Sequence, residues 1–150
     1  MLKFDERDKN EVNEYQANFH SVTDHVTIIG NITYKMLAQI SNIFKNIKSL
    51  DISGFRHELV ITSKITLPSL QSLRVNNTEQ LNYFTRLMSL KHIQIACWDK
   101  RIDIDEVFDP SKILEVDIGD INCFEVFPIT LFTNLRSLKW IIISLEASNL

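Results

Sequence analysis

Glycine is scarce in this chain of 150 residues, which contains only Gly30, Gly54 and Gly119. Because no two of these glycines lie close together, the sequence has neither the glycine motif of a dinucleotide-binding fold nor a phosphate-cradling loop. It also lacks the nucleophile elbow, in which glycines flank a catalytic serine. These absences exclude several classes of enzyme before any motif is considered.

Cysteine is rarer still, and Cys97 and Cys123 are too few to form a disulfide framework. Long apolar runs are missing as well, because the most obvious one, Trp140–Ile143, is far shorter than the ~20 residues of a membrane span. The first residues are charged and do not resemble a secretory signal. We therefore expect a reducing compartment, the cytoplasm or alternatively the nucleus, and no membrane partner.

An excess of positive charge is absent too. The formal net charge is -3, with 16 Lys and Arg residues against 19 Asp and Glu residues. Phosphate-backbone binding would lack its usual electrostatic driving force, so we expect no nucleic-acid partner. What the sequence does contain, 45% hydrophobic and 23% charged residues, is typical of a folded globular chain rather than a disordered one.

A short motif recurs along most of the chain. It consists of an apolar residue, two others, an apolar residue, one other and a final apolar residue. Clear copies open at Ile47, Leu70, Leu90, Ile113 and Leu135, and a degenerate copy opens at Thr23. The steps between copies are 20 to 24 residues. Another mostly apolar position precedes each opening residue by three, as at Phe44, Leu67, Leu87 and Phe132.

Residues 127–138, 67–75 and 43–52 carry this motif most clearly, and here the sequence resembles the leucine-rich repeat family. The family consensus runs leucine-x-x-leucine-x-leucine-x-x-asparagine. The resemblance covers about residues 19 to 143. It implies an α/β fold, a solenoid with a curved parallel β-sheet on its concave face and short helices or 3₁₀ turns on its convex face. The alternative is an α/β domain with parallel strands that is not a solenoid.

The asparagine position departs from the family pattern. It holds Asn31, Phe55, Thr78, Trp98, Ile121 and Ile143, of which only the first is asparagine. The resemblance therefore implies an irregular member, in which apolar packing replaces the usual asparagine ladder and curvature is uneven.

Each motif predicts a strand, because its fourth and sixth positions alternate toward one face. Residues 77–87 predict a short helix or 3₁₀ turn, since Leu81, Phe84 and Leu87 recur at three-residue steps. The three glycines are expected to mark strand ends. We expect a repeat domain of about six repeats at residues 19–150. Residues 1–18 form either a cap helix over the first strand, with Val12, Tyr15 and Phe19 on one face, or a flexible tail.

The outward positions of the predicted strands form rows on the concave face. A central row contains Asp51, Arg74, Gln94, Asp117 and Lys139, preceded by Thr27, and His92 falls in the row beside it. Asp51 and Arg74 are expected to be neighbours, as are Asp117 and Lys139, because adjacent strands lie about 4.8 Å apart. We take Asp51, Arg74, His92, Gln94, Asp117 and Lys139 as candidate partner-binding residues. Trp98 is either buried or an exposed anchor, and burial is favoured.

The sequence gives little support for a metal-binding or catalytic cluster. His25 and His92 share a row, but two strands separate them, which is too far for a common metal. Cys97 is expected past the strand end as a buried thiol. The acidic stretch from Asp99 to Asp109 lacks the glycine and final glutamate of a calcium loop, which favours a solvated strand or loop. We expect no catalytic site, no metal and no cofactor.

These observations favour a non-enzymatic protein–protein interaction module that presents its concave sheet to a protein partner. One alternative is a structural subunit held through the solenoid ends. The open edge of the last repeat would then pair with another chain, including a second copy. Another alternative rests on residues 37–47, which show a faint similarity to an F-box helix and imply a substrate-recognition component of a ubiquitin ligase. The leading leucine-proline of that motif is missing.

Overall fold

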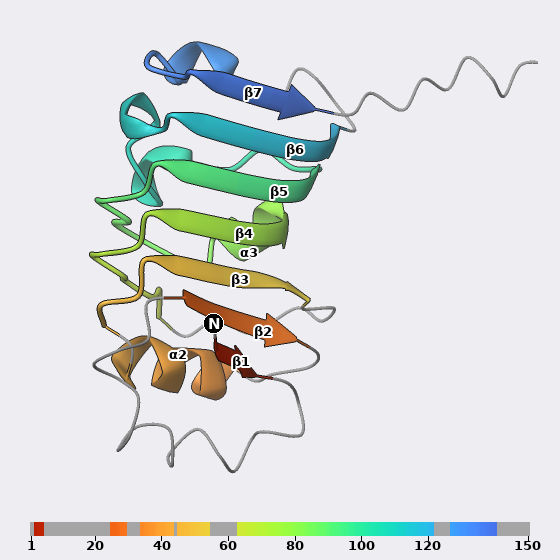
Figure 1. Ribbon diagram of the computed structural model, residues 1–150. Helices are drawn as coiled ribbons and strands as arrows, with labels where there is room; N and C mark the ends of the chain where they lie inside the picture. The colour runs from red at the N-terminus through yellow and green to blue at the C-terminus, as the bar shows by residue number, and fades with distance from the viewer. Residues whose placement is uncertain are drawn as a thin grey trace, which may run out of the picture.

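The computed structural model describes residues 2–4, 25–29, 34–43, 45–54, 63–121 and 127–140. The fold is α/β and contains a seven-stranded, all-parallel sheet that is not closed. The strands are β1 (Leu2–Phe4), β2 (His25–Ile29), β3 (Ser49–Gly54), β4 (Ser72–Asn77), β5 (His92–Trp98), β6 (Glu115–Ile121) and β7 (Ser137–Trp140). They are stacked in the order of the chain (Figure 1).

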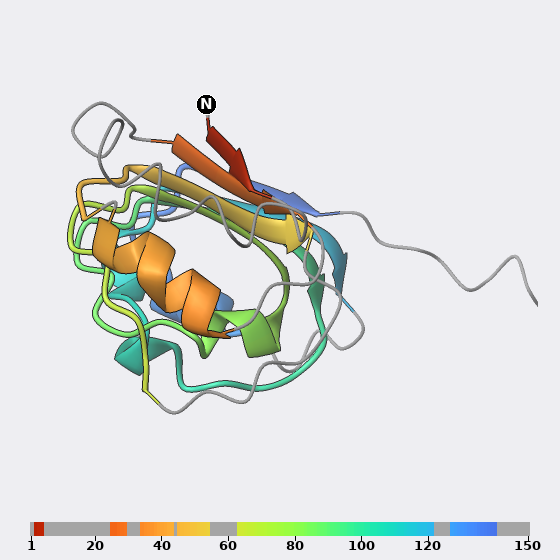
Figure 2. The same ribbon diagram turned by 90° about the horizontal axis from the view of Figure 1, so that it is seen from below.

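Short helical segments lie in the connections between strands. Among the described residues they are α2 (Tyr34–Ile43), α3 (Thr78–Leu81) and three 3₁₀ turns, η2 (Ile104–Glu106), η3 (Pro110–Lys112) and η5 (Ile129–Leu131). Parallel strands in sequential order, joined by crossovers of one hand, place all their connections on the same face of the sheet. Figure 2 shows α2 and α3 on that face. The opposite face is not crossed by any described connection, and we call it the open face.

The register of the sheet is the one that the sequence motif predicts. The fourth motif positions are direct pairing partners across the sheet, in the order Val26, Leu50, Leu73, Ile93, Val116 and Leu138. Buried and accessible residues alternate along β4 and β5, so one side of each strand faces the core. A strand period of two therefore fixes which side chains reach the open face.

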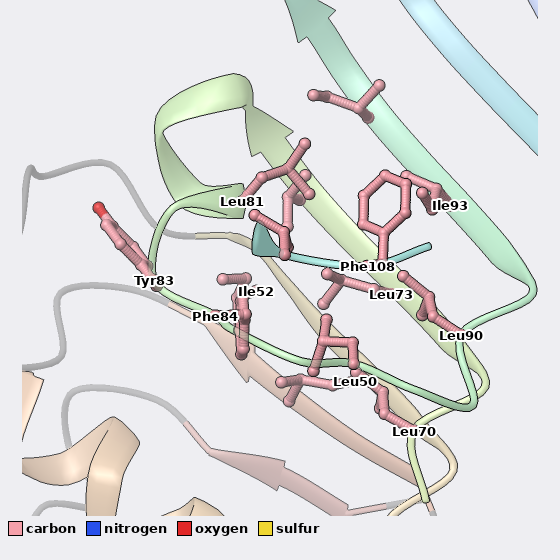
Figure 3. Close-up of a cluster of buried hydrophobic side chains, with 14 of the residues drawn as sticks. Leu50, Ile52, Leu70, Leu73, Leu81, Tyr83, Phe84, Leu90, Ile93 and Phe108 are labelled. Atoms are coloured by element: carbon pink, nitrogen blue, oxygen red, sulfur yellow. The ribbon is translucent and has the colours of Figure 1, made fainter. Parts of the chain in front are cut away.

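The core lies between the sheet and its connections. Leu50, Leu73 and Ile93 project from three neighbouring strands into this layer (Figure 3). They belong to one cluster with Phe84 and Phe108, which come from the connections and are buried. The opening motif positions Ile47, Leu70, Leu90 and Ile113 are buried in the same cluster. Each strand and its connection thus bury their apolar side chains against neighbouring units.

The N-terminal edge differs from the expected arrangement. β1 pairs in parallel with β2, with Leu2 opposite Val26, so a strand forms this edge of the described sheet, within the residues 1–18 where either a cap helix or a flexible tail was expected. This strand is additional to the six that the motif predicts. Val12, Tyr15 and Phe19, on which the cap helix was predicted, lie outside the described residues.

The last described strand is less well covered than the motif predicts. Trp140 occupies a sixth motif position, yet it is 40% exposed, whereas Ile118 at the equivalent position of β6 is fully buried. Leu135 and Leu138 are only partly buried. The reason is position, because β7 has one described neighbour in the sheet whereas β6 has two.

The glycines do not all mark strand ends. Gly54 is the last residue of β3, as predicted, but Gly119 lies inside β6. A Cβ atom at position 119 would lie 2.6 Å from the carbonyl oxygen of Ala96 on β5. Close approach of two backbones, not a turn, therefore requires glycine there. Gly30 lies outside the described residues.

In two repeats, the position that holds asparagine in the family consensus is occupied by a buried side chain of another type. Trp98 is 1% exposed and packs edge-on against Phe127, with ring centroids 5.0 Å apart. This confirms the burial expected for Trp98. Thr78 is fully buried, and its hydroxyl donates a hydrogen bond to Asp99 at 2.6 Å and accepts one from the backbone N–H of Lys100. Asn31, Phe55 and Ile143 lie outside the described residues.

The helix α2 falls where the faint F-box similarity was found. Leu37 is fully buried, and the Ser41 hydroxyl donates a hydrogen bond to the Leu37 carbonyl oxygen at 2.8 Å. Leu37 therefore packs into the protein's own core. None of the helices in the described ranges is long and apolar enough to cross a membrane.

Candidate functional site

The candidate site is the open face of the sheet from β3 to β7. The central row predicted from the sequence is present, because consecutive strands pair Asp51 with Arg74, Arg74 with Gln94, Gln94 with Asp117 and Asp117 with Lys139. His92 lies in the neighbouring row, between Ser72 and Glu115. All six candidate residues therefore share one surface. Arg74, Gln94 and Lys139 are exposed, whereas Asp51, His92 and Asp117 are partly buried.

Asp51 is the most firmly held residue of the central row. Its carboxylate accepts hydrogen bonds from the backbone N–H of Ser53 at 2.9 Å and from the Ser53 hydroxyl at 2.6 Å. It also lies 3.7 Å from the Arg74 guanidinium. The Arg74 side chain is 53% exposed, so this ion pair contributes less than about 1 kcal/mol to stability. Its effect is to fix the positions of two opposite charges on the face.

A second contact between strands lies beside the central row. His92 Nδ1 is 3.1 Å from a Glu115 carboxylate oxygen, across the pairing of β5 with β6. The sequence register placed these two residues side by side, but it did not predict that they interact. Asp117 and Lys139 are also neighbours in register, yet no ion pair joins them in the described part of the chain.

Charge alternates in sign along the central row. Asp51 and Asp117 are acidic, Arg74 and Lys139 are basic, and neutral Gln94 lies between the two pairs. Adjacent members are about 4.8 Å apart because they lie on adjacent strands. A face of mixed sign does not select for a polyanion such as nucleic acid. It does offer hydrogen-bond donors, acceptors and both charges to the varied surface of a protein.

The carboxyl ends of β4 and β5 carry a separate polar cluster. The Asn77 side chain caps α3 by accepting a hydrogen bond from the backbone N–H of Gln80. The Gln80 side chain accepts one from the backbone N–H of Asn76 at 2.6 Å. Asp99 holds the buried Thr78 hydroxyl, as described above. These hydrogen bonds hold the turns at the carboxyl ends of β4 and β5 in place.

The residues considered as metal ligands or catalytic groups do not lie together. His25 and His92 lie in one row with two strands between them, as predicted. Cys97 lies inside β5 and is partly buried, which corrects the expectation of a buried thiol beyond the strand end. Among the described residues, no group of three or more His, Cys, Asp and Glu side chains could hold a metal ion.

The acidic stretch is a loop with 3₁₀ turns, so of the two predicted alternatives, a strand or a loop, the structure has the loop. Asp103 and Asp105 are exposed around η2, and Glu106 forms an ion pair with Lys64 at 2.9 Å. Asp109 caps η3, accepting hydrogen bonds from the Ser111 hydroxyl at 2.6 Å and from the Ser111 backbone N–H at 3.0 Å. These carboxylates are thus bound to neighbouring groups or directed to solvent.

One pocket on the surface was not predicted from the sequence. A pocket of about 360 Å³ lies where β5, β6 and β7 begin, and we call it the strand-start pocket. It is lined by Met88, Ser89, Leu90, Lys91, Ser111, Lys112, Leu114, Asn134 and Arg136. A signal was present in the sequence, since Lys91 and Arg136 each follow directly after an opening motif residue.

Comparisons of the chain with protein-family models, curated proteins and solved structures give no match.

Proposed function

We propose that the chain is an irregular leucine-rich repeat protein and that it is a non-enzymatic protein-binding module. Its partner lies against the open face of the sheet, which would be the concave face of the solenoid. The observation that carries the proposal is the central row, where five consecutive strands present polar side chains of alternating charge in one unbroken register.

The repeat part of the proposal is supported by the position of the motif on the strands. In β3 to β6, the opening residue is buried just before the strand begins, and the fourth residue pairs with its equivalent on the next strand. One motif supplies one strand and one connection. Units of this kind cannot bury their apolar side chains alone and do so by stacking on neighbours.

The binding part is supported by the rigidity of the face. Its side chains stand on hydrogen-bonded strands at fixed spacing, and the Asp51 carboxylate is held by Ser53 and Arg74. A preformed surface loses little conformational freedom when a partner binds. The mechanism is therefore rigid-body recognition, with Arg74, Gln94 and Lys139 as the exposed contacts of the central row.

A charge exchange tests this proposal without altering the net charge. The double variant Arg74→Glu with Asp117→Lys inverts the sign of two central-row positions. We expect proteins captured from the native source by the tagged wild-type chain to be retained about tenfold less by this variant. Tenfold corresponds to about 1.4 kcal/mol of binding free energy. Quantitative mass spectrometry of the retained proteins provides the measurement.

The matched control exchanges an ion pair on the connecting segments. Lys64→Glu with Glu106→Lys also preserves net charge and alters a pair that lies away from the open face. This variant is expected to retain the same proteins as the wild type. Equal retention by the central-row variant would contradict binding through the open face.

A second candidate function, that of a structural subunit held by its end, is favoured by the exposure of the last unit. Trp140, Leu131 and Ile129 are 40%, 42% and 47% exposed. Apolar side chains exposed at the end of a sheet suit burial against another chain. In this case Trp140→Ser with Leu131→Ser abolishes association while the central-row variant preserves it. Light scattering at increasing concentration separates self-association from binding to a different protein.

A further inference from the structure

The strand-start pocket gathers positive charge in a chain whose net charge is -3. Lys91 precedes β5, Lys112 ends η3 and Arg136 precedes β7, and all three side chains are exposed. Lys112 lies 3.9 Å from the Asp109 carboxylate, which partly offsets its charge. Lys91 and Arg136 form no ion pair with any described residue. Two full positive charges at this pocket therefore remain to attract an anionic group.

Backbone hydrogen bonds hold these residues in register. The Gln71 carbonyl oxygen accepts from the N–H groups of both Lys91 and His92, at 2.9 and 3.0 Å. In the same way, the Lys91 carbonyl oxygen accepts from Leu114 at 2.8 Å, and that of Leu114 accepts from Arg136 at 2.8 Å. Lys91, Leu114 and Arg136 thus lie at equivalent positions, just before the successive strands β5, β6 and β7. Two strand spacings separate Lys91 from Arg136, roughly 9.6 Å.

The pocket also has an apolar part. Met88 is 57% exposed, although its neighbours Leu87 and Leu90 are each 1% exposed. The turn that presents it is fixed, because Arg86 has a left-handed backbone with φ 52° and accepts a hydrogen bond from the Met88 N–H at 2.9 Å. Methionine side chains adapt to varied apolar surfaces. Met88 and the partly buried Leu114 can therefore cover an apolar side chain between the two positive charges.

We propose that the strand-start pocket binds an acidic peptide segment of a protein partner, with carboxylates on Lys91 and Arg136 and an apolar residue on Met88. In a polyproline II conformation, residues three apart lie on the same side and about 9.3 Å from each other. That separation fits the roughly 9.6 Å between Lys91 and Arg136. The apolar side chains of Met88 and Leu114 favour a peptide over nucleic acid as the ligand. The net charge of the chain favours it as well, because nucleic-acid binding depends on a larger excess of positive charge. This site is separate from the open face and does not depend on the proposed function.

The probe for this proposal is a fluorescein-labelled heptapeptide, Gly-Glu-Leu-Pro-Glu-Leu-Gly, titrated with the full chain and followed by fluorescence anisotropy. We expect saturable binding that Lys91→Glu and Arg136→Glu each weaken about tenfold or more, because each replaces an attraction with a repulsion. Met88→Ser weakens binding severalfold through loss of apolar contact. Replacing both leucines of the probe by serine weakens it to a similar extent.

The matched control is Lys48→Glu, which makes the same change of charge in the same row, just before β3 and two strands away from Lys91. It is expected to change the affinity less than about twofold. Equal effects of Lys48→Glu and Lys91→Glu would show a diffuse electrostatic attraction and overturn the site. Absence of saturable binding to the wild type would overturn it too, as would tighter binding of an oligouridylate than of the peptide.

One further variant separates this proposal from the proposed function. Arg74→Glu with Asp117→Lys leaves peptide binding unchanged if the strand-start pocket is the site. If that variant abolished peptide binding while Lys91→Glu did not, the peptide would lie on the open face. The pocket proposal would then fail, and the open face would keep its role.

Discussion

At position 119 the sheet leaves no room for a side chain, because a Cβ atom there would lie 2.6 Å from the Ala96 carbonyl oxygen. The obstacle is backbone, so it cannot move aside as the end of a flexible side chain would. Gly119→Ala is therefore expected to lower the free energy of unfolding by about 1–3 kcal/mol, the range for overpacked sites. Urea denaturation followed by circular dichroism measures the loss.

The control lies on the opposite strand. Ala96 is exposed, and Ala96→Ser adds one atom toward solvent. This change is expected to alter stability by less than about 0.5 kcal/mol. If Gly119→Ala were equally mild, the close approach of β5 and β6 at this position would be wrong.

Asp109 gives a second test at the residue scale. The hydrogen bond from the Ser111 hydroxyl is the main cause that holds the pKa of Asp109 below its ordinary value of 3.8. A lowered folded-state pKa contributes stability that is present above the unfolded-state value and is lost as pH falls through the folded-state value. Asp109→Asn keeps the shape and removes the charge. It is expected to destabilise the protein at pH 7 by under about 1 kcal/mol, since the Asp109 side chain is 43% exposed and solvent screens its charge.

The pH dependence distinguishes this from a general packing defect. The difference between wild type and Asp109→Asn is expected to shrink as pH falls below 3.8 toward the lowered folded-state pKa of Asp109, because the carboxyl then becomes uncharged, as asparagine is at every pH. Denaturant titrations at several pH values measure this difference. A difference that stayed constant from pH 7 to the acid range would mean that the carboxylate charge contributes nothing.

Individual residues of the open face were predictable because a strand has a period of two. The motif fixed the inward residues, so the residues between them, such as Arg74 and Gln94, had to face outward. Some side-chain contacts on this face were not predictable in the same way. Ser53 binds Asp51 through two hydrogen bonds, and His92 contacts Glu115, because of side-chain rotamers that the pattern does not specify.

At the scale of elements, an aromatic cluster joins the end of β5 to the connection that contains η5. Trp98 packs edge-on against Phe127, and Phe127 stacks on Phe132 with centroids 5.5 Å apart. Trp98→Ala is expected to lower the free energy of unfolding by about 3–5 kcal/mol, because it removes a large buried ring. Trp140→Ala removes a ring that is 40% exposed and is expected to have a clearly smaller effect.

Fluorescence checks the same assignment without denaturation. The chain has two tryptophans, Trp98 buried and Trp140 partly exposed. Trp140→Phe leaves only the buried indole and is expected to shift the emission maximum to shorter wavelength. Trp98→Phe is expected to shift it to longer wavelength. Shifts in the opposite directions would contradict the burial of Trp98.

Some elements could not be predicted from the sequence motif. Strands β3 to β7 were predicted because each has a complete motif. β1 was not, since three residues carry no period that can be read, and it is defined only by its pairing with β2. The exposure of Trp140 was missed for a related reason, because the pattern treats the last repeat as if it were covered like an inner one.

At the scale of the whole molecule, strands contact mainly their sequence neighbours, so stability is expected to vary along the stack. Backbone amides of β5, which has a strand on each side and fully buried core residues, are expected to exchange about tenfold or more slowly than those of β7. Hydrogen exchange followed by mass spectrometry measures this gradient. Uniform protection from β3 to β7 would indicate a single cooperative unit instead.

At the scale of the whole molecule, site-specific photo-crosslinking identifies the surface through which the protein binds its partner. A photoreactive amino acid is placed at Gln94 on the open face, at Lys91 beside the strand-start pocket, at Trp140 on the last strand or at Thr130 in η5. Each variant is then irradiated in extract of the native source. We expect a discrete protein adduct at Gln94 and none at Thr130. Adducts at Trp140 without any at Gln94 would contradict binding through the open face.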